Sequence, residues 1–214
     1  MGNLRADGAY RRYVLRYYNR FANLYDLGEF MRHRTRRKAV RLSGWQPGDR
    51  VLDLCTGTGG LALAFASHGA AVVGVDIARG MLKRASSKRH ASAVKWLEMD
   101  ATRLAFPDAA FDVSLLSLAL HHMPEAEQVN VLSELRRVTR RRIVLIEPEV
   151  PVKPGWFGAW AFVASVIDES EYMHEWVRQD FIGTCRKAGL RVERVETSRF
   201  WIHRFILCNP MNPK

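Results

Sequence analysis

The segment from Val51 to Gly60 constrains the fold of this chain more than any other. It reads Val-Leu-Asp-Leu-Cys-Thr-Gly-Thr-Gly-Gly, a short run of β-forming residues that leads into a glycine-rich loop. An apolar run of helical character, Leu-Ala-Leu-Ala-Phe-Ala, follows at once. The strand is apolar on both faces, which is typical of a parallel strand covered by helices on both sides. The segment therefore predicts a strand–loop–helix unit of an α/β fold.

The same alternation continues along the chain. Further strands are expected at 71–76, 94–100, 111–120 and 141–148, and the helices between them at 61–69, 78–89 and 125–138. Strands that alternate with helices indicate right-handed βαβ units and an open, doubly wound sheet. The runs 190–200 and 201–208 are expected to pair antiparallel at the sheet edge, after a helix near 176–188.

The net charge of +11 is concentrated in two places. Residues 1–41 contain eleven Arg and Lys against three Asp and Glu, a balance of +8, and the second cluster consists of Arg136, Arg137, Arg140, Arg141 and Arg142. Such clusters indicate a membrane surface, a nucleic acid or another phosphate-bearing partner, unless they are simply solvated helix faces. The segment 9–27 has the periodicity of an amphipathic helix, and the segment 29–42 is expected to form a second helix that ends at Ser43-Gly44.

The rest of the composition indicates the cellular compartment in which the protein is expected. No apolar run is long enough to span a membrane, and the charged first twenty residues argue against a signal peptide. Three cysteines are too few and too scattered for a disulfide framework or a zinc site, so no metal is expected. We expect a cytoplasmic protein, whose basic N-terminal segment could hold it at the membrane periphery.

Acidic residues mark the ends of three expected strands. Asp53 lies inside the first strand, where a carboxylate suits a cationic ligand group better than a pyrophosphate. Asp76 follows Gly57 by 19 positions, where a carboxylate can bind both hydroxyls of a ribose. The pair Asp100-Ala101 ends the third strand, at the place of an adenine edge. The strict G-x-G-x-x-G pattern of dinucleotide enzymes is absent, because Ala62 occupies the last position.

These strand ends resemble those of the class I S-adenosylmethionine-dependent methyltransferases, and within them the ubiquinone/menaquinone C-methyltransferases and their small-molecule relatives. The matching stretches between Asp49 and Pro148 are VLDLCTGTGGLALAFA, VVGVDIARGMLKRA, LEMDATRLAFPDAAFDVSLLSLALHHMP and LSELRRV. The resemblance implies a Rossmann-like, doubly wound seven-stranded sheet with an antiparallel C-terminal strand and an N-terminal helical cap. It also implies S-adenosyl-L-methionine as cofactor and S-adenosyl-L-homocysteine as product.

The resemblance divides the single domain 1–214 into four parts. These are a basic helical cap at 1–44, a cofactor-binding core at 45–148, a lid insert at 149–176 and a C-terminal helix with the edge strands at 177–214. The insert contains Trp156, Phe157, Trp160, Phe162, Tyr172, Met173 and Trp176, which suit a lid over an apolar substrate or ordinary core packing. Thr139 to Arg142 replace the Pro-Gly-Gly turn that is usual before the fifth strand, so a basic turn is expected there.

The resemblance also implies roles for individual residues. Asp53, Gly57, Thr58 and Gly59 would hold the amino acid part of the cofactor, Asp76 the ribose, Ile77 and Met81 the adenosine, and Asp100 and Ala101 the adenine, with further contacts from Cys55, Ser117 and Tyr17. Each position has a structural alternative. Asp53 and Asp100 could cap or pair within the fold, and Cys55 and Ser117 could be packing residues.

Methyl transfer is an in-line displacement, so the enzyme mainly aligns the acceptor, and a base is needed only if the acceptor carries a proton. His121 and His122 follow the fourth strand and are candidates for that base, unless one of them caps the next helix or covers the cofactor. Tyr17, Tyr18 and Tyr25 lie on the expected N-terminal helix, and one of them could shield or orient the methyl group, with packing as the alternative.

We therefore expect methyl transfer to a small or lipophilic acceptor, such as a quinone precursor. A phospholipid amine would suit the same charge pattern. An RNA methyltransferase is a third alternative, although no appended RNA-binding module and no Asn/Asp-Pro-Pro-aromatic motif after the fourth strand supports it. The fourth alternative is a non-catalytic subunit that binds the cofactor and supports a partner. The sequence does not indicate an oligomeric state.

Overall fold

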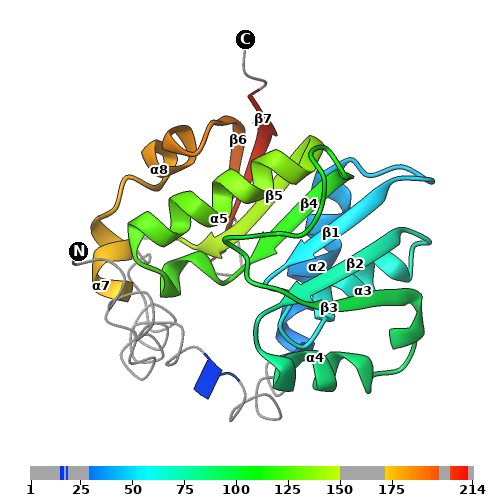
Figure 1. Cartoon of the computed structure of the whole chain (residues 1–214). Coiled ribbons are helices and arrows are strands. Elements are labelled where there is room, and N and C mark those ends of the chain that lie inside the picture. Colours follow the sequence, from blue (N-terminus) through cyan, green and yellow to red (C-terminus); the bar gives the residue numbers. More distant parts are fainter. Residues whose placement is uncertain (1–14, 17, 19–28, 150–171, 198–202, 212–214) are drawn as a thin grey trace.

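A seven-stranded mixed sheet organises the chain in the computed structural model, which describes residues 15–16, 18, 29–149, 172–197 and 203–211. The strands are β1 (Arg50–Leu54), β2 (Ala71–Asp76), β3 (Val94–Glu98), β4 (Phe111–Ser117), β5 (Thr139–Pro148), β6 (Leu190–Thr197) and β7 (His203–Pro210). Their order across the sheet is β3-β2-β1-β4-β5-β7-β6, and β7 runs antiparallel to both of its neighbours (Figure 1). The doubly wound α/β fold with an antiparallel C-terminal strand is confirmed.

Helices lie on both faces of the sheet (Figure 1). They are α2 (Glu29–Ser43), α3 (Gly60–Ala66), α4 (Arg79–Ser86), α5 (Glu125–Val138), α7 (Tyr172–Arg178) and α8 (Phe181–Lys187), with short 3-10 turns at Ala91–Ala93 and Leu120–His122. Helices α2 and α3 share a buried cluster on one face, and α5 and α8 share another on the opposite face. Among the described helices, none has both the length and the apolar character needed to cross a membrane.

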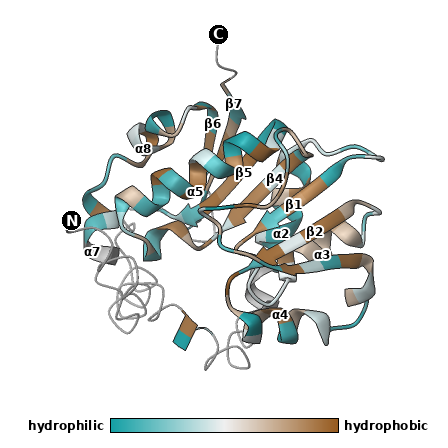
Figure 2. Ribbon diagram, viewed as in Figure 1, coloured by the Kyte–Doolittle hydropathy of each residue, from teal (hydrophilic) through white to brown (hydrophobic). Residues whose placement is uncertain are grey.

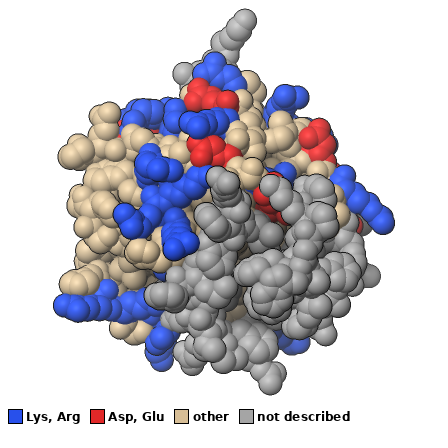
Figure 3. All heavy atoms as spheres, turned by 180° about the vertical axis from the view of Figure 1, so that it is seen from behind, with Lys and Arg blue, Asp and Glu red and all other residues tan. Residues whose placement is uncertain are grey.

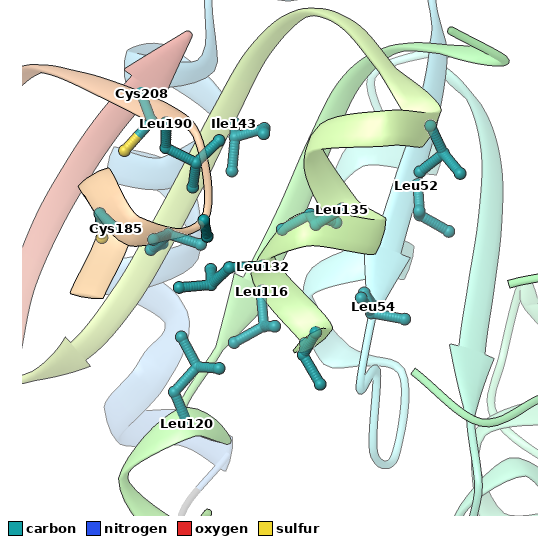
Figure 4. Close-up of a cluster of buried hydrophobic side chains, with 14 of the residues drawn as sticks. Leu52, Leu54, Leu116, Leu120, Leu132, Leu135, Ile143, Cys185, Leu190 and Cys208 are labelled. Carbon is teal, nitrogen blue, oxygen red and sulfur yellow. The ribbon is translucent and has the colours of Figure 1, made fainter. Parts of the chain in front are cut away.

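The hydrophobic residues gather on the central strands and on the helix faces that cover them (Figure 2). In β1, Val51 packs on the side of α3, whereas Leu52 and Leu54 pack on the side of α5. Figure 4 shows Leu132 and Leu135 of α5 between Leu54 and Leu116 of the sheet and Cys185 of α8. Because β1 is buried on both faces, its apolar pattern correctly predicted a central parallel strand.

The helix expected at 176–188 is wrong as a single element, because two helices occupy this region. Asp180 separates them and is the N-cap of α8: its Oδ1 accepts a hydrogen bond from the amide of Gly183 at 3.0 Å. The side chain of Gln179 turns inward and hydrogen-bonds Gln128 of α5 and Thr184 of α8. These side-chain contacts replace the backbone bonds of a continuous helix.

The basic turn expected at Thr139 to Arg142 is also wrong, because α5 passes directly into β5 at Thr139. The hydroxyl of Thr139 bonds the carbonyl of Leu135 at 2.5 Å and the hydroxyl of Ser114 at 2.6 Å, which ties the junction to β4. The register between β4 and β5 shifts here, as β5 accommodates an extra residue before Arg142. Strand pairing, rather than a turn, therefore ends the helix.

All five arginines of the cluster at 136–142 have partners within the protein. The partners are the carbonyl of Met211 for Arg136, the carboxylates of Glu134 and Asp108 for Arg137, Asp112 for Arg140, Asp49 for Arg141 and Glu193 for Arg142. Near the C-terminal strands, basic and acidic side chains lie next to one another (Figure 3). This cluster is therefore committed to intramolecular contacts, which weakens the case for it as an anion-binding surface.

Candidate functional site

The glycine-rich loop after β1 bends through three residues with positive φ. Cys55, Gly57 and Gly59 have φ values of 55°, 55° and 78°. The amide of Thr56 donates to the carbonyl of Val75 in β2 at 2.9 Å, so the loop is tied to the neighbouring strand. Gly59 is required by space as well as by φ, because a Cβ there would lie 2.4 Å from the Trp96 ring. The loop conformation follows from its glycines and its close packing.

Asp53 is buried in β1 and bonds its own loop. Its Oδ2 accepts hydrogen bonds from the hydroxyl of Thr56 at 2.5 Å and from the amide of Ala62 at 3.0 Å. Burial raises the pKa of Asp53 from 3.8 to about 7, although both hydrogen bonds oppose this shift. Asp53 thus forms hydrogen bonds within the fold, which was the structural alternative expected for it. These bonds connect β1 to the glycine loop and to the start of α3.

The raised pKa of Asp53 predicts a pH-dependent stability. The folded protein binds a proton at Asp53 more tightly than the unfolded chain does, so this contribution is present at low pH and is lost as pH rises from about 4 to about 7. Between pH 5 and pH 8 we expect the wild type to lose ~3 kcal/mol of unfolding free energy relative to Asp53→Asn. Urea denaturation at both pH values measures this difference, and parallel pH profiles of the two proteins would contradict it.

Asp76, at the end of β2, holds two backbone segments together. Its Oδ2 accepts the amide of Gly57 at 2.8 Å and its Oδ1 accepts the amide of Ala78 at 2.8 Å. Desolvation raises the pKa of Asp76, and the backbone hydrogen bonds oppose the shift. The carboxylate therefore links the glycine loop to the segment that enters α4.

A cavity of about 380 Å³ opens at the carboxyl ends of the parallel strands. Nine of the expected site residues line it, namely Cys55, Gly57, Asp76, Ile77, Met81, Asp100, Ala101, Ser117 and His122. They come from the ends of β1, β2, β3 and β4 and from the segments that follow. This is where ligands bind in open α/β sheets, at the point where the strand order reverses between β1 and β4.

A second, smaller cavity of about 60 Å³ is also lined by residues of the glycine loop. Asp53 and Thr58 line this cavity, together with Thr35 and Arg36 of α2. Four residues, Cys55, Gly57, Ser117 and Leu118, line both cavities, so the two are neighbouring parts of one site. Gly59 lines neither, and its role in the structure is to allow the approach of Trp96.

Asp100 contributes to the turn after β3 and to the main cavity. Its Oδ1 accepts hydrogen bonds from the amide of Thr102 at 3.0 Å and from its hydroxyl at 2.7 Å, so the carboxylate fixes this turn. Asp100 and Ala101 both line the main cavity, and their contact with an adenine stays a prediction.

The two adjacent histidines lie in different environments. His122 lines the main cavity, and burial together with the neighbouring His121 lowers its pKa well below 6.5. His121 is 5% exposed, and its Nδ1 lies 2.6 Å from Oε2 of Glu147. His122 therefore contributes a neutral imidazole to the lining of the main cavity. His121 does not line this cavity and contacts Glu147 instead.

The Cys55 thiol lies between the two cavities and remains a thiol. Desolvation and the nearby carboxylates, Asp76 first among them, raise its pKa well above the usual value. A thiolate is the reactive form of cysteine, so Cys55 is not suited to act as a nucleophile, and its contact with the cofactor stays a prediction. Its backbone takes the positive φ that glycine would accept more readily.

Several lining residues were not singled out from the sequence. They are Thr35, Arg36, Leu54, Leu61, Val75, Met99, Thr102, Leu118, Ala119, Met123, Glu127, Asn130, Val131, Ile146 and His203. Tyr18, one of the tyrosines expected on the N-terminal helix, lines the main cavity. Glu127 and Asn130, one helical turn apart at the start of α5, are the members that periodicity could have indicated. Tyr17, Tyr25, Trp156, Phe157, Trp160 and Phe162 lie outside the described residues, as do the side chains of Tyr172 and Met173. Trp176 is buried against Phe181, which is core packing.

Comparison with known proteins identifies relatives of this chain. A family model described as a methyltransferase domain matches residues 51–142. The chain is 37% identical over 145 residues to the 2-phytyl-1,4-naphtoquinone methyltransferase of Synechococcus elongatus, covering 63% of this chain and 61% of that protein. It is 42% identical over 131 residues to the demethylmenaquinone methyltransferase of Thermus thermophilus, covering 58% of each. The chain thus spans about six-tenths of the length of these curated relatives.

Solved structures share the fold. A putative methyltransferase of Bacillus halodurans has a TM-score of 0.59 and 25% identity, covering 75% of this chain and 71% of that chain. The magnesium protoporphyrin IX methyltransferase of Synechocystis, solved with bound S-adenosylhomocysteine, has a TM-score of 0.61 and 21% identity, covering 83% of this chain and 82% of that chain. The strand order of the sheet is the one expected from the resemblance to methyltransferases, and the curated relatives carry methyltransferase names. Residues 51–142 of this chain match a methyltransferase domain, and the chain shares the fold of these solved methyltransferase structures.

Proposed function

We propose that the protein transfers a methyl group from S-adenosylmethionine to a small or lipophilic acceptor related to quinone precursors. The observation that carries the proposal is the lining of the main cavity, which combines carboxylates with apolar side chains. Asp76, Asp100 and Glu127 are the carboxylates, and Leu118 and Met123 are among the apolar residues. The two curated relatives described above carry quinone-related names, which supports this choice of acceptor.

The donor groups present fit the cofactor. When bound, S-adenosylmethionine supplies an electrophilic methyl group on a positively charged sulfur. The carboxylate of Asp76 would accept the ribose hydroxyls, and Asp100 with Ala101 would contact the adenine. Asp53, Gly57 and Thr58 would face the amino acid part from the smaller cavity. A cavity of about 380 Å³ is of the size that holds a small molecule.

The apolar residues of the lining, such as Leu118 and Met123, would align the acceptor and exclude water. A neutral His122 does not repel a cationic cofactor, as an imidazolium would. Its lone pair can take a proton from an acceptor hydroxyl, although the lowered pKa makes it a weak base. We therefore assign most of the rate enhancement to alignment and a smaller part to proton removal by His122.

The proposal extends to the membrane surface, where a lipophilic acceptor dissolves. Arg34, Arg37 and Arg41 are exposed on the described part of the basic N-terminal segment. Each basic residue near an anionic surface contributes about 1 kcal/mol of binding, so a few can localise the enzyme there.

One experiment tests the acceptor and the surface together. A reduced prenylated naphthoquinone is presented in phosphatidylcholine vesicles with and without phosphatidylglycerol, and S-adenosylhomocysteine and the methylated quinol are measured by mass spectrometry. We expect product on both vesicles and a several-fold higher rate on the anionic ones, with the increase removed by Arg37→Glu combined with Arg41→Glu. Methylation of phosphatidylethanolamine instead would favour the phospholipid alternative, and cofactor binding without S-adenosylhomocysteine formation would favour a non-catalytic subunit.

A further inference from the structure

Glu147, near the end of β5, is a fully buried carboxylate that lines neither cavity. Both of its oxygens contact the turn after β4. Oε1 accepts hydrogen bonds from the backbone amides of Ala119 at 3.1 Å and Leu120 at 3.0 Å, and Oε2 lies 2.6 Å from Nδ1 of His121. Burial of a carboxylate is costly unless donors surround it, and this turn supplies three.

The turn that Glu147 holds has an unusual backbone. Leu118 has a φ of 55°, a region that a branched side chain rarely adopts unless the surrounding structure holds it there. The amide of Leu118 donates to the carbonyl of Ile146 at 2.8 Å, one residue before Glu147. Leu118, Ala119 and His122 all line the main cavity. Contacts from the end of β5 therefore hold this strained turn, and residues of the same turn line the main cavity.

The side chains of the turn form a row of rings from the core to the cavity. The ring of His121 lies 6.1 Å from the buried Trp176 and 3.9 Å from His122, measured between centroids. On its other side, the His122 ring meets the edge of Tyr18, with centroids 6.1 Å apart and the planes inclined by 77°. A shift of the His121 ring would therefore move the ring of His122.

We propose that Glu147 is a positioning residue for the methyl transfer: through the turn amides and the His121 ring, it holds His122 against the cavity. Its effect on catalysis rests on the proposed function. Its effect on the His121 ring can be measured without any acceptor, so the two are tested separately.

Glu147→Gln makes a specific prediction for the His121 ring. The proposal requires that the carboxylate of Glu147 accepts a hydrogen bond from Nδ1 of His121, because this bond would hold the ring in one orientation. The glutamine carbonyl must accept both turn amides, which leaves its NH₂ group facing His121, and Nδ1 must then become an acceptor. We expect ¹⁵N NMR to show a proton on Nδ1 of His121 in the wild type and no proton on Nδ1 in the variant. An unchanged tautomer would overturn the proposal.

The kinetic consequence is a split between turnover and cofactor binding. For Glu147→Gln we expect kcat to fall at least tenfold, while the Kd for S-adenosylmethionine stays within threefold of the wild type. Glu193→Gln, on β6 among surface arginines, is the matched control and should leave both unchanged. Equal loss of cofactor affinity and turnover would show a general structural role and would overturn the assignment, as would an unchanged kcat.

A second pair of variants keeps the test decisive if Glu147→Gln does not fold. His121→Asn places an amide donor near the position of Nδ1, whereas His121→Phe leaves Oε2 of Glu147 without that donor. We expect the asparagine variant to retain at least five times the kcat of the phenylalanine variant, and equal values would overturn the proposal. A wild type inactive on every acceptor would contradict the proposed function alone, because the tautomer measurement still decides the positioning of His121.

Discussion

Replacing Asp76 by alanine is expected to weaken the binding of S-adenosylmethionine about 100-fold, because removing a buried, hydrogen-bonded carboxylate costs ~2–5 kcal/mol. The variant loses the proposed ribose acceptor and leaves the amides of Gly57 and Ala78 without their partner. The glycine loop and the entry to α4 would then no longer be held in register. Isothermal titration calorimetry with S-adenosylmethionine measures the change directly.

Asp112→Ala is the matched control for this variant. The Asp112 carboxylate also accepts a backbone amide, that of Arg50 at 3.0 Å, and it pairs with Arg140, but it lies at the opposite end of the parallel strands. The control should bind the cofactor with the affinity of the wild type. An Asp76→Ala protein that keeps its circular dichroism spectrum and binds within threefold of the wild type would disprove the role of Asp76.

Gly59→Ala is expected to be among the most destabilising single methyl additions in the loop. The added Cβ would lie 2.4 Å from one Trp96 ring atom and 2.9 Å from another, and the residue would keep a φ of 78°. Positive φ costs a non-glycine residue ~1–2 kcal/mol and overpacking ~1–3 kcal/mol, so a loss of about 2–5 kcal/mol is expected. Urea denaturation followed by tryptophan fluorescence and circular dichroism measures the loss.

Two other glycines separate the causes. Gly69 has a φ of 89° but no atom within 4 Å of the position that a Cβ would take, so Gly69→Ala should show the backbone cost alone. Gly74 lies in β2 without positive φ, and its added Cβ would meet Trp96 at 2.6 Å, so Gly74→Ala should show the packing cost alone. If Gly59→Ala is no less stable than Gly69→Ala, the Trp96 ring moves aside without cost and the proposed clash is incorrect.

The elements that could be predicted from the sequence are those whose residue pattern lies within one short segment of the chain. The β-strand alternation, the glycine loop and the strand-end positions of Asp76 and Asp100 all follow from spacing along the chain. The helix at 125–138 was predicted to the residue, because its apolar period and its start after Pro124 are both explicit.

The elements that could not be predicted depend on contacts distant in sequence. Glu147 is a glutamate before a proline-rich segment, and only the fold brings the amides of Ala119 and Leu120 to it across 28 and 27 positions. The break at Gln179 depends on a partner in α5, Gln128, 51 positions away. Asp53 is a third example. Its burial could be predicted from the apolar strand around it, but its hydrogen bonds with Thr56 and Ala62 could be found only from the folded positions of those residues.

The outermost strand, β6, has a consequence for how copies of this protein meet. An exposed strand edge is a template on which another chain can add a strand and begin to aggregate. In β6, Arg191, Glu193, Arg194 and Glu196 alternate in sign, and several pair with one another or with neighbours. A second molecule that docked here would have to strip water from these charges and break their pairs. At this edge, the protein resists fibril-like self-association.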